Sequence, residues 1–590
     1  MTDVEAPSRR RPTARLAVAY VLAEAVVLIA LIGPLIGQPW WSGFRRYFSN
    51  DQLSYAGIAA NVAGGNASLV EPFTLTGSLF YPSLWYQLIG AVARVTTVPV
   101  HVVWTVLGLA VVSAAVLSAG WLAHRLSGAA LAPVLPALAL LTGVLAAPTV
   151  DYWYAGLGVH AVVWGPYGTL FTLNAEAAGL SLLIIAMVLL VWAAWSPSAP
   201  ARRRAASVLI AAGLIGLLAG VQTYSFFTGV TLSLLFVACR SLLVSRSQPR
   251  TWATVGLLTT ALIVGGLLTD VVGPFPILGL VLLSLAPALW PVVRARPLLA
   301  LAAVAVAALA SAPQIVRTLS GLAADDPFLT YRQDSTDNLG VLYSATAFAT
   351  LPLLLVCAAC AVALWRRGQP TLAGLLIAVL AGLGIMSTND LWGFHQEPYR
   401  FWLQYTILGL VLLAPVLAWS LAQLSSIARP RRIALISVAA VAALTWAVSL
   451  ADFAGFWAFA RDEGVISMSD ERLDAARLIL ADSSGIVMSS RCLDPQVLKQ
   501  VTRGPVAHYN KGLAWPADVE AFEIFKDVER RAGEDPVALR AAGVGVVLTD
   551  SACADDWAFP ATQEVLPLRE QEYVMDGQAQ SLRLWLVAPA

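Results

Sequence analysis

The chain has 590 residues, of which 58% are hydrophobic and only 12% are charged, and its mean hydropathy is +0.72. Because roughly 25% of the residues in a soluble domain are charged, this composition excludes an ordinary soluble globular protein. The net charge of +1 gives no indication of a nucleic-acid partner, and we expect none.

Apolar runs recur along most of the chain. A run of about 20 apolar residues can cross the roughly 30 Å of hydrocarbon in a bilayer. The sequence therefore predicts a multi-spanning α-helical membrane protein with about thirteen transmembrane helices. They are expected at residues 14–36, 100–123, 129–147, 177–195, 206–222, 224–240, 251–269, 275–293, 297–316, 340–364, 370–387, 401–424 and 432–452.

Arginines set the expected orientation, because positive residues favour the cytoplasmic loops. The basic opening segment, residues 1–13, lacks a small-residue cleavage site and is expected to be a cytoplasmic tail, not a removed signal peptide. Splitting the apolar region at residues 222–225 places both neighbouring basic loops inside. The expected outer segments are residues 37–99, 148–176, 317–339, 388–400 and 453–590.

The last segment, residues 453–590, differs in character from the rest. Helix-period stretches such as "DERLDAARLIL" alternate with short β-branched runs such as "VGVVLTD". This alternation predicts a small α/β domain on the outer face of the plasma membrane. The expected organisation is a tail (1–13), a transmembrane domain (14–452) whose first external loop is 37–99, and this C-terminal domain.

Five cysteines carry little chemistry. Cys492 and Cys553 lie in the C-terminal segment, where an oxidising outer face would allow a disulfide. They could equally be two unpaired small residues. The other three fall in predicted spans, and no Cys/His spacing indicates a zinc site. The sequence also lacks a Walker A motif, a dinucleotide fingerprint and a nucleophile elbow.

An acidic residue directly follows the first predicted span, in the stretch "SNDQLSYAGIAANVAGG". Asp51, Tyr55 and Ile58 have helical spacing and would share one helix face. The stretch is too polar to span a membrane, so it is expected to lie along the outer surface. In "FYPSLWYQLIG", Pro82 is expected near the first turn of a second amphipathic surface helix.

This order of elements resembles the GT-C superfamily of membrane glycosyltransferases. Members carry an acidic residue just after the first span, followed by two surface helices, and they use polyprenyl-phosphate or polyprenyl-diphosphate sugar donors outside the membrane. Asp51 and the aromatic-proline turn at Tyr81 match this pattern, although Ser83 replaces the second proline of many members. The topology is also similar to that of actinobacterial arabinofuranosyl- and mannosyltransferases and of the oligosaccharyltransferase catalytic subunit.

The resemblance implies that Asp51 is the general base, because an ionised carboxylate can accept the proton of an attacking hydroxyl. Tyr55, on the same face, is a candidate substrate-binding residue. The alternative interpretation is that Asp51 only caps the surface helix, as Asp, Asn and Ser often do.

Outward-facing arginines are the second candidate feature, because a guanidinium fork suits phosphate oxygens. Arg400 and then Arg332 are the predicted donor-phosphate ligands. Arg400 lies in "STNDLWGFHQEPYRFWLQY", where His395, Glu397 and Tyr399 are candidate substrate-binding residues. A polar cluster beside a span is costly and usually functional. The alternative is an interfacial belt of aromatic and polar side chains.

A second acidic residue, Asp151, is a further candidate for substrate binding, and Glu176 is another acidic residue of the same outer segment. Some members of the superfamily bind a divalent metal with two such acids, so Asp51 and Asp151 could share Mg or Mn. Members that use monophosphate donors often need no metal, and the cofactor prediction stays open between these cases.

The expected function is transfer of a sugar from a polyprenyl-phosphate donor to a cell-envelope glycan or lipid on the outer face. The Ala, Val, Leu and Arg-rich composition is typical of a high-GC actinobacterium, which favours arabinofuranose or mannose. Two alternatives remain. A lipid-linked sugar transporter or flippase would show internal repeats and mid-membrane charges, which we do not see. A non-catalytic protein of envelope assembly is compatible with the same sequence.

Overall fold

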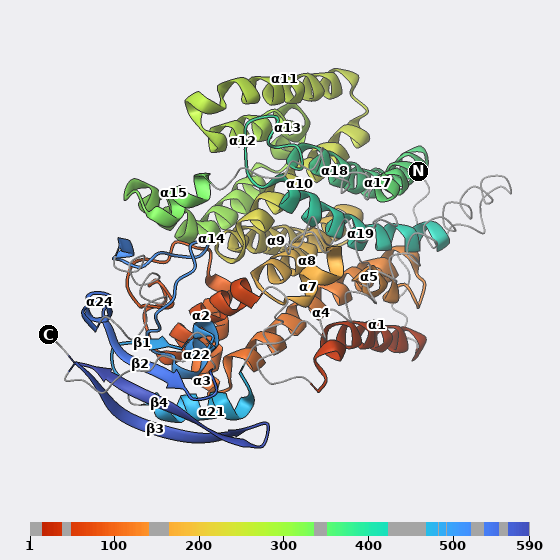
Figure 1. Cartoon of the computed structure of the whole chain (residues 1–590). Coiled ribbons are helices and arrows are strands. Elements are labelled where there is room, and N and C mark those ends of the chain that lie inside the picture. The colour runs from red at the N-terminus through yellow and green to blue at the C-terminus, as the bar shows by residue number, and fades with distance from the viewer. Residues whose placement is uncertain are drawn as a thin grey trace. The chain divides into compact units, whose positions relative to one another are not determined.

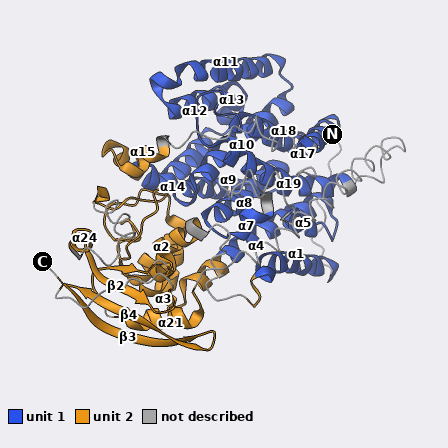
Figure 2. Ribbon diagram, viewed as in Figure 1, with its two compact units in different colours: residues 1–34, 108–316, 334–458 blue, residues 35–107, 317–333, 459–590 orange. Residues whose placement is uncertain are grey.

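The computed structural model of the chain consists mainly of helices, with one sheet formed by the C-terminal residues (Figure 1). It divides into two compact units: unit 1 comprises residues 1–34, 108–316 and 334–458, and unit 2 comprises residues 35–107, 317–333 and 459–590 (Figure 2). The structure describes residues 14–37, 49–140, 165–334, 351–422, 468–481, 483–490, 492–520, 536–553 and 564–588.

All regular secondary structure in the described residues of unit 1 is helical. Two of its helices continue into unit 2: α4 begins there and α14 ends there. The helices are α1 (Ala14–Ile32), α4 (Val100–Ser127), α5 (Val134–Leu140), α7 (Gly165–Phe171), α8 (Ala175–Trp195), α9 (Ala201–Val221), α10 (Thr223–Ser245), α11 (Gln248–Val272), α12 (Pro274–Leu283), α13 (Ala286–Ala295), α14 (Pro297–Ala323), α17 (Leu351–Arg366), α18 (Pro370–Met386) and α19 (Pro398–Ala422).

Among the described residues, eight helices are long and apolar enough to cross a membrane, or nine if the bent pair α12 and α13 is one span. The multi-spanning character is therefore supported, but the expected count of thirteen is not reached. α17 and α18 are apolar but short, α5 covers only part of the predicted span 129–147, and the predicted span 432–452 lies outside the described residues.

Two boundaries inside unit 1 show how local sequence decides where helices stop. Gln222 is extended between α9 and α10, and its Oε1 accepts hydrogen bonds from the backbone N–H groups of Tyr224 (2.6 Å) and Ser225 (3.1 Å). This confirms the predicted split. The predicted span 275–293 is not one straight helix, because a 63° bend separates α12 from α13. Pro287 follows this break and cannot donate a helical hydrogen bond.

Helix α19 is the most enclosed of the candidate membrane-spanning helices in the described residues. In its most apolar stretch 89% of the residues are buried, against 11% for α11 and 6% for α14. Lipid would cover the exposed apolar side chains of α11 and α14 in a bilayer. Close helix contacts rely on small residues: a Cβ at Gly216 of α9 would overlap the carbonyl oxygen of Ala307 in α14.

Unit 2 joins the first predicted external loop to the C-terminal segment. Its sheet has the order β1-β2-β4-β3, with β1 and β2 parallel and the other pairs antiparallel. Asp576 and Gly577 both have positive φ, as a tight hairpin turn between β3 and β4 requires. The elements are α2 (Ser49–Gly64), α3 (Leu84–Thr96), α15 (Pro327–Asp334), α21 (Asp470–Ile479), β1 (Ile486–Ser489), α22 (Pro495–Thr502), α24 (Pro536–Ala541), β2 (Val544–Asp550), β3 (Val565–Met575) and β4 (Gln578–Val587).

The predicted domain boundaries, and the prediction that the C-terminal segment lies on the outer side of the membrane, both depend on which side of the membrane each segment occupies. They stay predictions. A labelling experiment tests them. Ser484 and Ser198 are both exposed, and the described cysteines lie either in helices of unit 1 or in a disulfide. We expect Ser484→Cys to react with a membrane-impermeant maleimide in intact cells and Ser198→Cys to react only after permeabilisation. The reverse pattern would invert the topology.

The helix that carries Asp51 is more buried than the sequence suggests. The predicted helix is present, but exposure falls along the predicted face: Asp51 is exposed, Tyr55 is half-buried and Ile58 is 1% exposed. Its location along the outer membrane surface stays a prediction. Almost every residue of α2 between positions 52 and 61 is buried. Small residues explain this burial, because Gly90 of α3 packs so closely on Ala59 that a Cβ there would overlap its carbonyl oxygen.

The second surface helix, α3, has the amphipathic pattern that the sequence predicts. It buries Trp85, Tyr86 and Ile89 and leaves Leu88 and Val95 exposed. It begins at Leu84, two residues after Pro82. The proline therefore lies just before the N-cap Ser83, near the first turn as predicted.

Candidate active site

Asp51 occupies the first turn of α2, and its side chain is exposed. Among the described residues its carboxylate forms no hydrogen bond and no ion pair. The positive end of the helix dipole favours a negative charge at this position. The carboxylate is thus available to a reactant, although the same position also suits a charge that only stabilises the helix end.

Tyr55, one helical turn after Asp51, belongs to a row of stacked aromatic rings. Its ring lies 5.5 Å from that of Tyr81 and 5.0 Å from that of Tyr86, and both pairs are nearly parallel. Tyr86 stacks in turn on Trp104 at 5.3 Å. Burial raises the pKa of Tyr55 well above its ordinary value, and the nearby phenol of Tyr81 and the charge of Asp51 act in the same direction. The Tyr55 hydroxyl therefore keeps its proton and can donate a hydrogen bond.

The aromatic-proline turn is held by an arginine. The guanidinium of Arg317 donates to the backbone carbonyl of Leu79 and, at 3.1 Å, to that of Tyr81. The ring of Phe328, in α15, meets Tyr81 edge-on at 6.2 Å. Arg317 lies at the start of the predicted outer segment 317–339, and it fixes the backbone of the turn.

A second cluster lies in unit 1, where three helices begin. Arg400 is in the first turn of α19, Glu176 in that of α8 and Tyr224 in that of α10. The Arg400 guanidinium forms ion pairs with Glu397 and, at 3.6 Å, with Glu176. It also lies over the rings of Tyr224 (5.1 Å) and Tyr399 (5.8 Å).

Asn389, which the sequence did not single out, organises the loop before α19. The Asn389 side chain donates to the carbonyls of Met386 (2.7 Å) and Gln396 (2.9 Å) and accepts from the Gln396 N–H at 2.6 Å. His395 and Glu397 adopt left-handed backbone conformations in this turn. As a result Glu397 is buried beside Arg400, whereas His395 is exposed.

Two acceptor oxygens in the Arg400 cluster have no hydrogen-bond partner within the described part of the chain. They are Oε1 of Glu176 and Oε1 of Gln404. Gln404 is fully buried, and its Nε2 donates to Ser225 Oγ at 3.2 Å. A buried oxygen without a partner is costly, so this cluster suits a ligand that donates hydrogen bonds. No sequence motif singles out Gln404 or Ser225, which are separated by 179 positions.

The predicted site residues fall into both units. Asp51, Tyr55 and Arg332 belong to unit 2, whereas Arg400, Glu397, Tyr399 and His395 belong to unit 1. Arg332 lies on α15 and is half-buried. Asp151 lies outside the described residues, so its role and the possible Mg or Mn site stay predictions.

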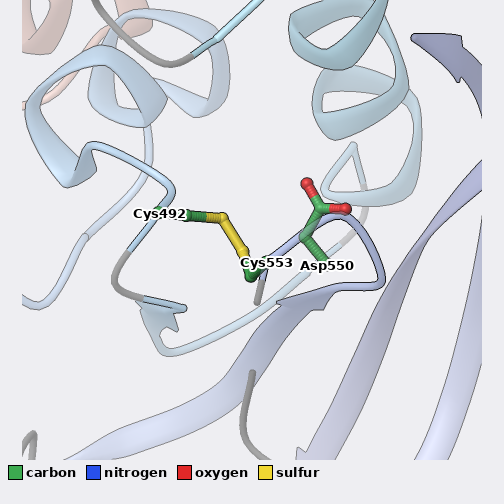
Figure 3. Close-up of side chains that lie close together, drawn as sticks. All are labelled: Cys492, Asp550 and Cys553. Atoms are coloured by element: carbon green, nitrogen blue, oxygen red, sulfur yellow. A yellow bond between two sulfur atoms is a disulfide. The ribbon is translucent and has the colours of Figure 1, made fainter. Parts of the chain in front are cut away.

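One group of side chains in the described residues has the spacing of metal ligands: Cys492, Asp550 and Cys553 (Figure 3). Its donors are already used. The two cysteines form a disulfide with Cα atoms 5.9 Å apart, which settles the pairing that the sequence left open. Asp550 is ion-paired with Arg472 and accepts from the Tyr573 hydroxyl at 2.8 Å. These side chains therefore stabilise the sheet and do not form a metal site.

No protein-family model matches the chain, and no curated protein matches it. Among solved structures, it is similar to the archaeal oligosaccharyltransferase AglB from Archaeoglobus fulgidus in complex with an inhibitory peptide and a dolichol-phosphate. The identity is 14%, the TM-score is 0.45, and the match covers 91% of this chain and 69% of that chain.

The chain is also similar to ArnT from Cupriavidus metallidurans bound to undecaprenyl phosphate. Here the identity is 13%, the TM-score is 0.46, and the match covers 97% of this chain and 98% of that chain. At these identities and scores the likenesses carry no functional argument, and the side chains of this protein have to supply one.

Proposed function

We propose that the protein is a membrane glycosyltransferase of the GT-C class that transfers a sugar from a polyprenyl-phosphate donor to a cell-envelope glycan or lipid. Asp51 is the general base, and arabinofuranose or mannose is the transferred sugar. The observation that carries the proposal is the exposed Asp51 carboxylate. It stands at the start of a largely buried helix, one turn before Tyr55 of the aromatic row.

The chemistry needs a base, a site for the sugar and cationic donors for the leaving phosphate. An ionised carboxylate takes the proton of the acceptor hydroxyl as the hydroxyl oxygen attacks the anomeric carbon, and the bond from that carbon to the phosphate oxygen breaks. Tyr55 supplies a protonated hydroxyl next to Asp51. The unpartnered oxygens of Glu176 and Gln404 suit sugar hydroxyls. Arg400 and Arg332 are the proposed phosphate-binding residues, and His395, Glu397 and Tyr399 are proposed substrate-binding residues.

Arg400 should be needed for donor binding. Hydrogen bonds to charged groups contribute about 1.5–3 kcal/mol, so Arg400→Ala should weaken donor binding roughly 10- to 100-fold and acceptor binding much less. Arg400→Lys should restore only part of the affinity, because a point charge lacks the planar fork. The measurement is titration of a polyprenyl-phosphate sugar into purified protein, with exposed Arg203→Ala as the matched control. An equal loss for donor and acceptor would make Arg400 an interfacial anchor.

The charge of the Arg400 cluster allows a second variant, Glu397→Gln, to be tested in the same donor titration. When both Glu176 and Glu397 are ionised, the single guanidinium leaves an excess of one negative charge, which opposes a second anion. If the donor phosphate meets Arg400, Glu397→Gln should tighten donor binding because it removes that excess. If Glu397→Gln weakens donor binding instead, the cluster holds the sugar hydroxyls and the phosphate lies elsewhere.

The proposed function is tested by incubating the purified protein with labelled polyprenyl-phosphate sugars and an envelope-glycan acceptor. A transferase moves the label to the acceptor and releases sugar-free polyprenyl phosphate. A flippase would move intact donor across a vesicle membrane without cleaving it, and a non-catalytic assembly protein would do neither.

A further inference from the structure

The C-terminal residues of unit 2 contact the helix that carries Asp51 through a buried polar network. Ser54 and Gln496 are 0% and 4% exposed. The Gln496 Nε2 group donates to Ser54 Oγ at 3.2 Å, and Asn510 Nδ2 donates to the same oxygen at 3.0 Å. Most buried polar groups have hydrogen-bond partners. Here Ser54 Oγ accepts from both amides, whereas Oε1 of Gln496 has no partner among the described residues.

Helix α22 presents a second glutamine to α2. Gln500 lies one turn after Gln496 on the same face of α22. Its amide reaches the α2 backbone at the Leu53 carbonyl (3.4 Å), or, with the amide reversed, at the Ala56 carbonyl and the Gly57 N–H, each at 3.2 Å. Two side chains of α22 thus hold one turn of α2, the turn that directly follows Asp51.

The glutamines are themselves fixed in position. Asp494 caps α22 by accepting from the Gln496 N–H at 2.8 Å, and Pro495 fills the first helical position. The Gln496 Nε2 group also lies 2.9 Å from His508 Nε2, and the His508 ring meets the edge of Phe73 at 4.6 Å. Phe73 packs on Gly57 of α2, where an added Cβ would come within 3.3 Å. The network therefore touches α2 from two directions.

We infer that α22 is a positioning element of the active site, and that Gln496 orients the first turn of α2 through Ser54. Ser54 is three residues after Asp51 and therefore lies on a neighbouring position of the same helix surface. The inference rests on the proposed function, because it assigns α22 the task of aiming the Asp51 carboxylate. Gln496 itself does not touch the reactants.

A small misplacement of a catalytic group is expensive. Shifting a reacting group by about 1 Å can cost roughly 100-fold in rate. Gln496→Met keeps the length of the side chain and removes its hydrogen bonds. We expect it to lower kcat by roughly 10- to 100-fold while the donor KM stays nearly unchanged, because the donor contacts are not altered. Gln578→Met, at an exposed position of β4, is the matched control and should leave kcat unchanged.

Hydrogen exchange of the full-length protein supplies a readout that does not depend on activity. Gln496→Met should accelerate amide exchange in residues 49–57 and leave the amides of β2 and β4 as they are in the wild type. Unchanged exchange in residues 49–57 would overturn the inference whatever the activity does. Faster exchange with an unchanged kcat would also overturn it, because the contact would then be structural only. If the wild type transfers no sugar with any donor, the proposed function fails and the positioning role falls with it.

Discussion

Asp51→Asn should lower the turnover of sugar transfer by about 10²–10⁴-fold, the usual contribution of a general base, with the protein still folded and still binding donor. The substitution keeps the size of the side chain and its ability to cap a helix, since Asn caps about as well as Asp. Only the capacity to accept a proton is lost. Asp51→Glu should retain little activity, because one added methylene moves the carboxylate by about 1 Å.

The matched control for this substitution is Asp325→Asn. Asp325 is an exposed acid in another predicted outer segment, and its positive φ of 50° is a backbone conformation that asparagine tolerates. It should transfer sugar like the wild type. Wild-type turnover by Asp51→Asn itself would mean that Asp51 only stabilises the end of α2, and the main support for an enzyme would be gone.

Arg472→Ala should destabilise the C-terminal sheet by about 3–5 kcal/mol, the cost of leaving one partner of a buried ion pair alone. The side chains of Arg472 and Asp550 are 3% and 0% exposed. Arg472 Nη2 also donates to Cys492 Sγ at 2.8 Å, so the guanidinium links α21 to the disulfide as well as to the end of β2. Its loss leaves the Asp550 carboxylate with the Tyr573 hydroxyl and the local Ala552 N–H.

Hydrogen exchange in β2 and β4 measures this effect within the full-length protein. At about 1.36 kcal/mol per tenfold change, the expected destabilisation corresponds to an acceleration of roughly 10²–10⁴-fold. Arg583→Ala is the control, because Arg583 and Glu570 form an exposed pair, 2.9 Å apart, of the kind that contributes about 1 kcal/mol or less. Equal acceleration in the two variants would show that the buried pair does not hold the sheet.

The sequence predicts the local features of this protein well. Apolar runs locate most helices of unit 1, and the polar Gln222 marks the split between α9 and α10 because its own side chain caps the second helix. The break between α12 and α13 was not predicted, because the apolar composition around it led to a single predicted span.

Contacts between distant residues could not be predicted in this way. α2 reads as a surface helix because its partner helix α22 lies more than 400 positions away: 442 residues separate Ser54 from Gln496. Likewise Glu176 shares no motif with Arg400, and only the fold brings the starts of α8, α10 and α19 together. The sequence could not distinguish a disulfide from two unpaired cysteines. The pairing of β1 with β2 brings Cys492 beside Cys553.

The central claim is that this protein cleaves a polyprenyl-phosphate sugar and that Asp51 accepts the proton. The most direct measurement is release of sugar-free polyprenyl phosphate from labelled donor, in the presence of acceptor, by purified wild type and Asp51→Asn, with donor binding recorded for both. We predict release by the wild type, a turnover about 10²–10⁴-fold lower for Asp51→Asn, and equal donor binding. No release by the wild type despite donor binding, or equal release by both proteins, would contradict the account.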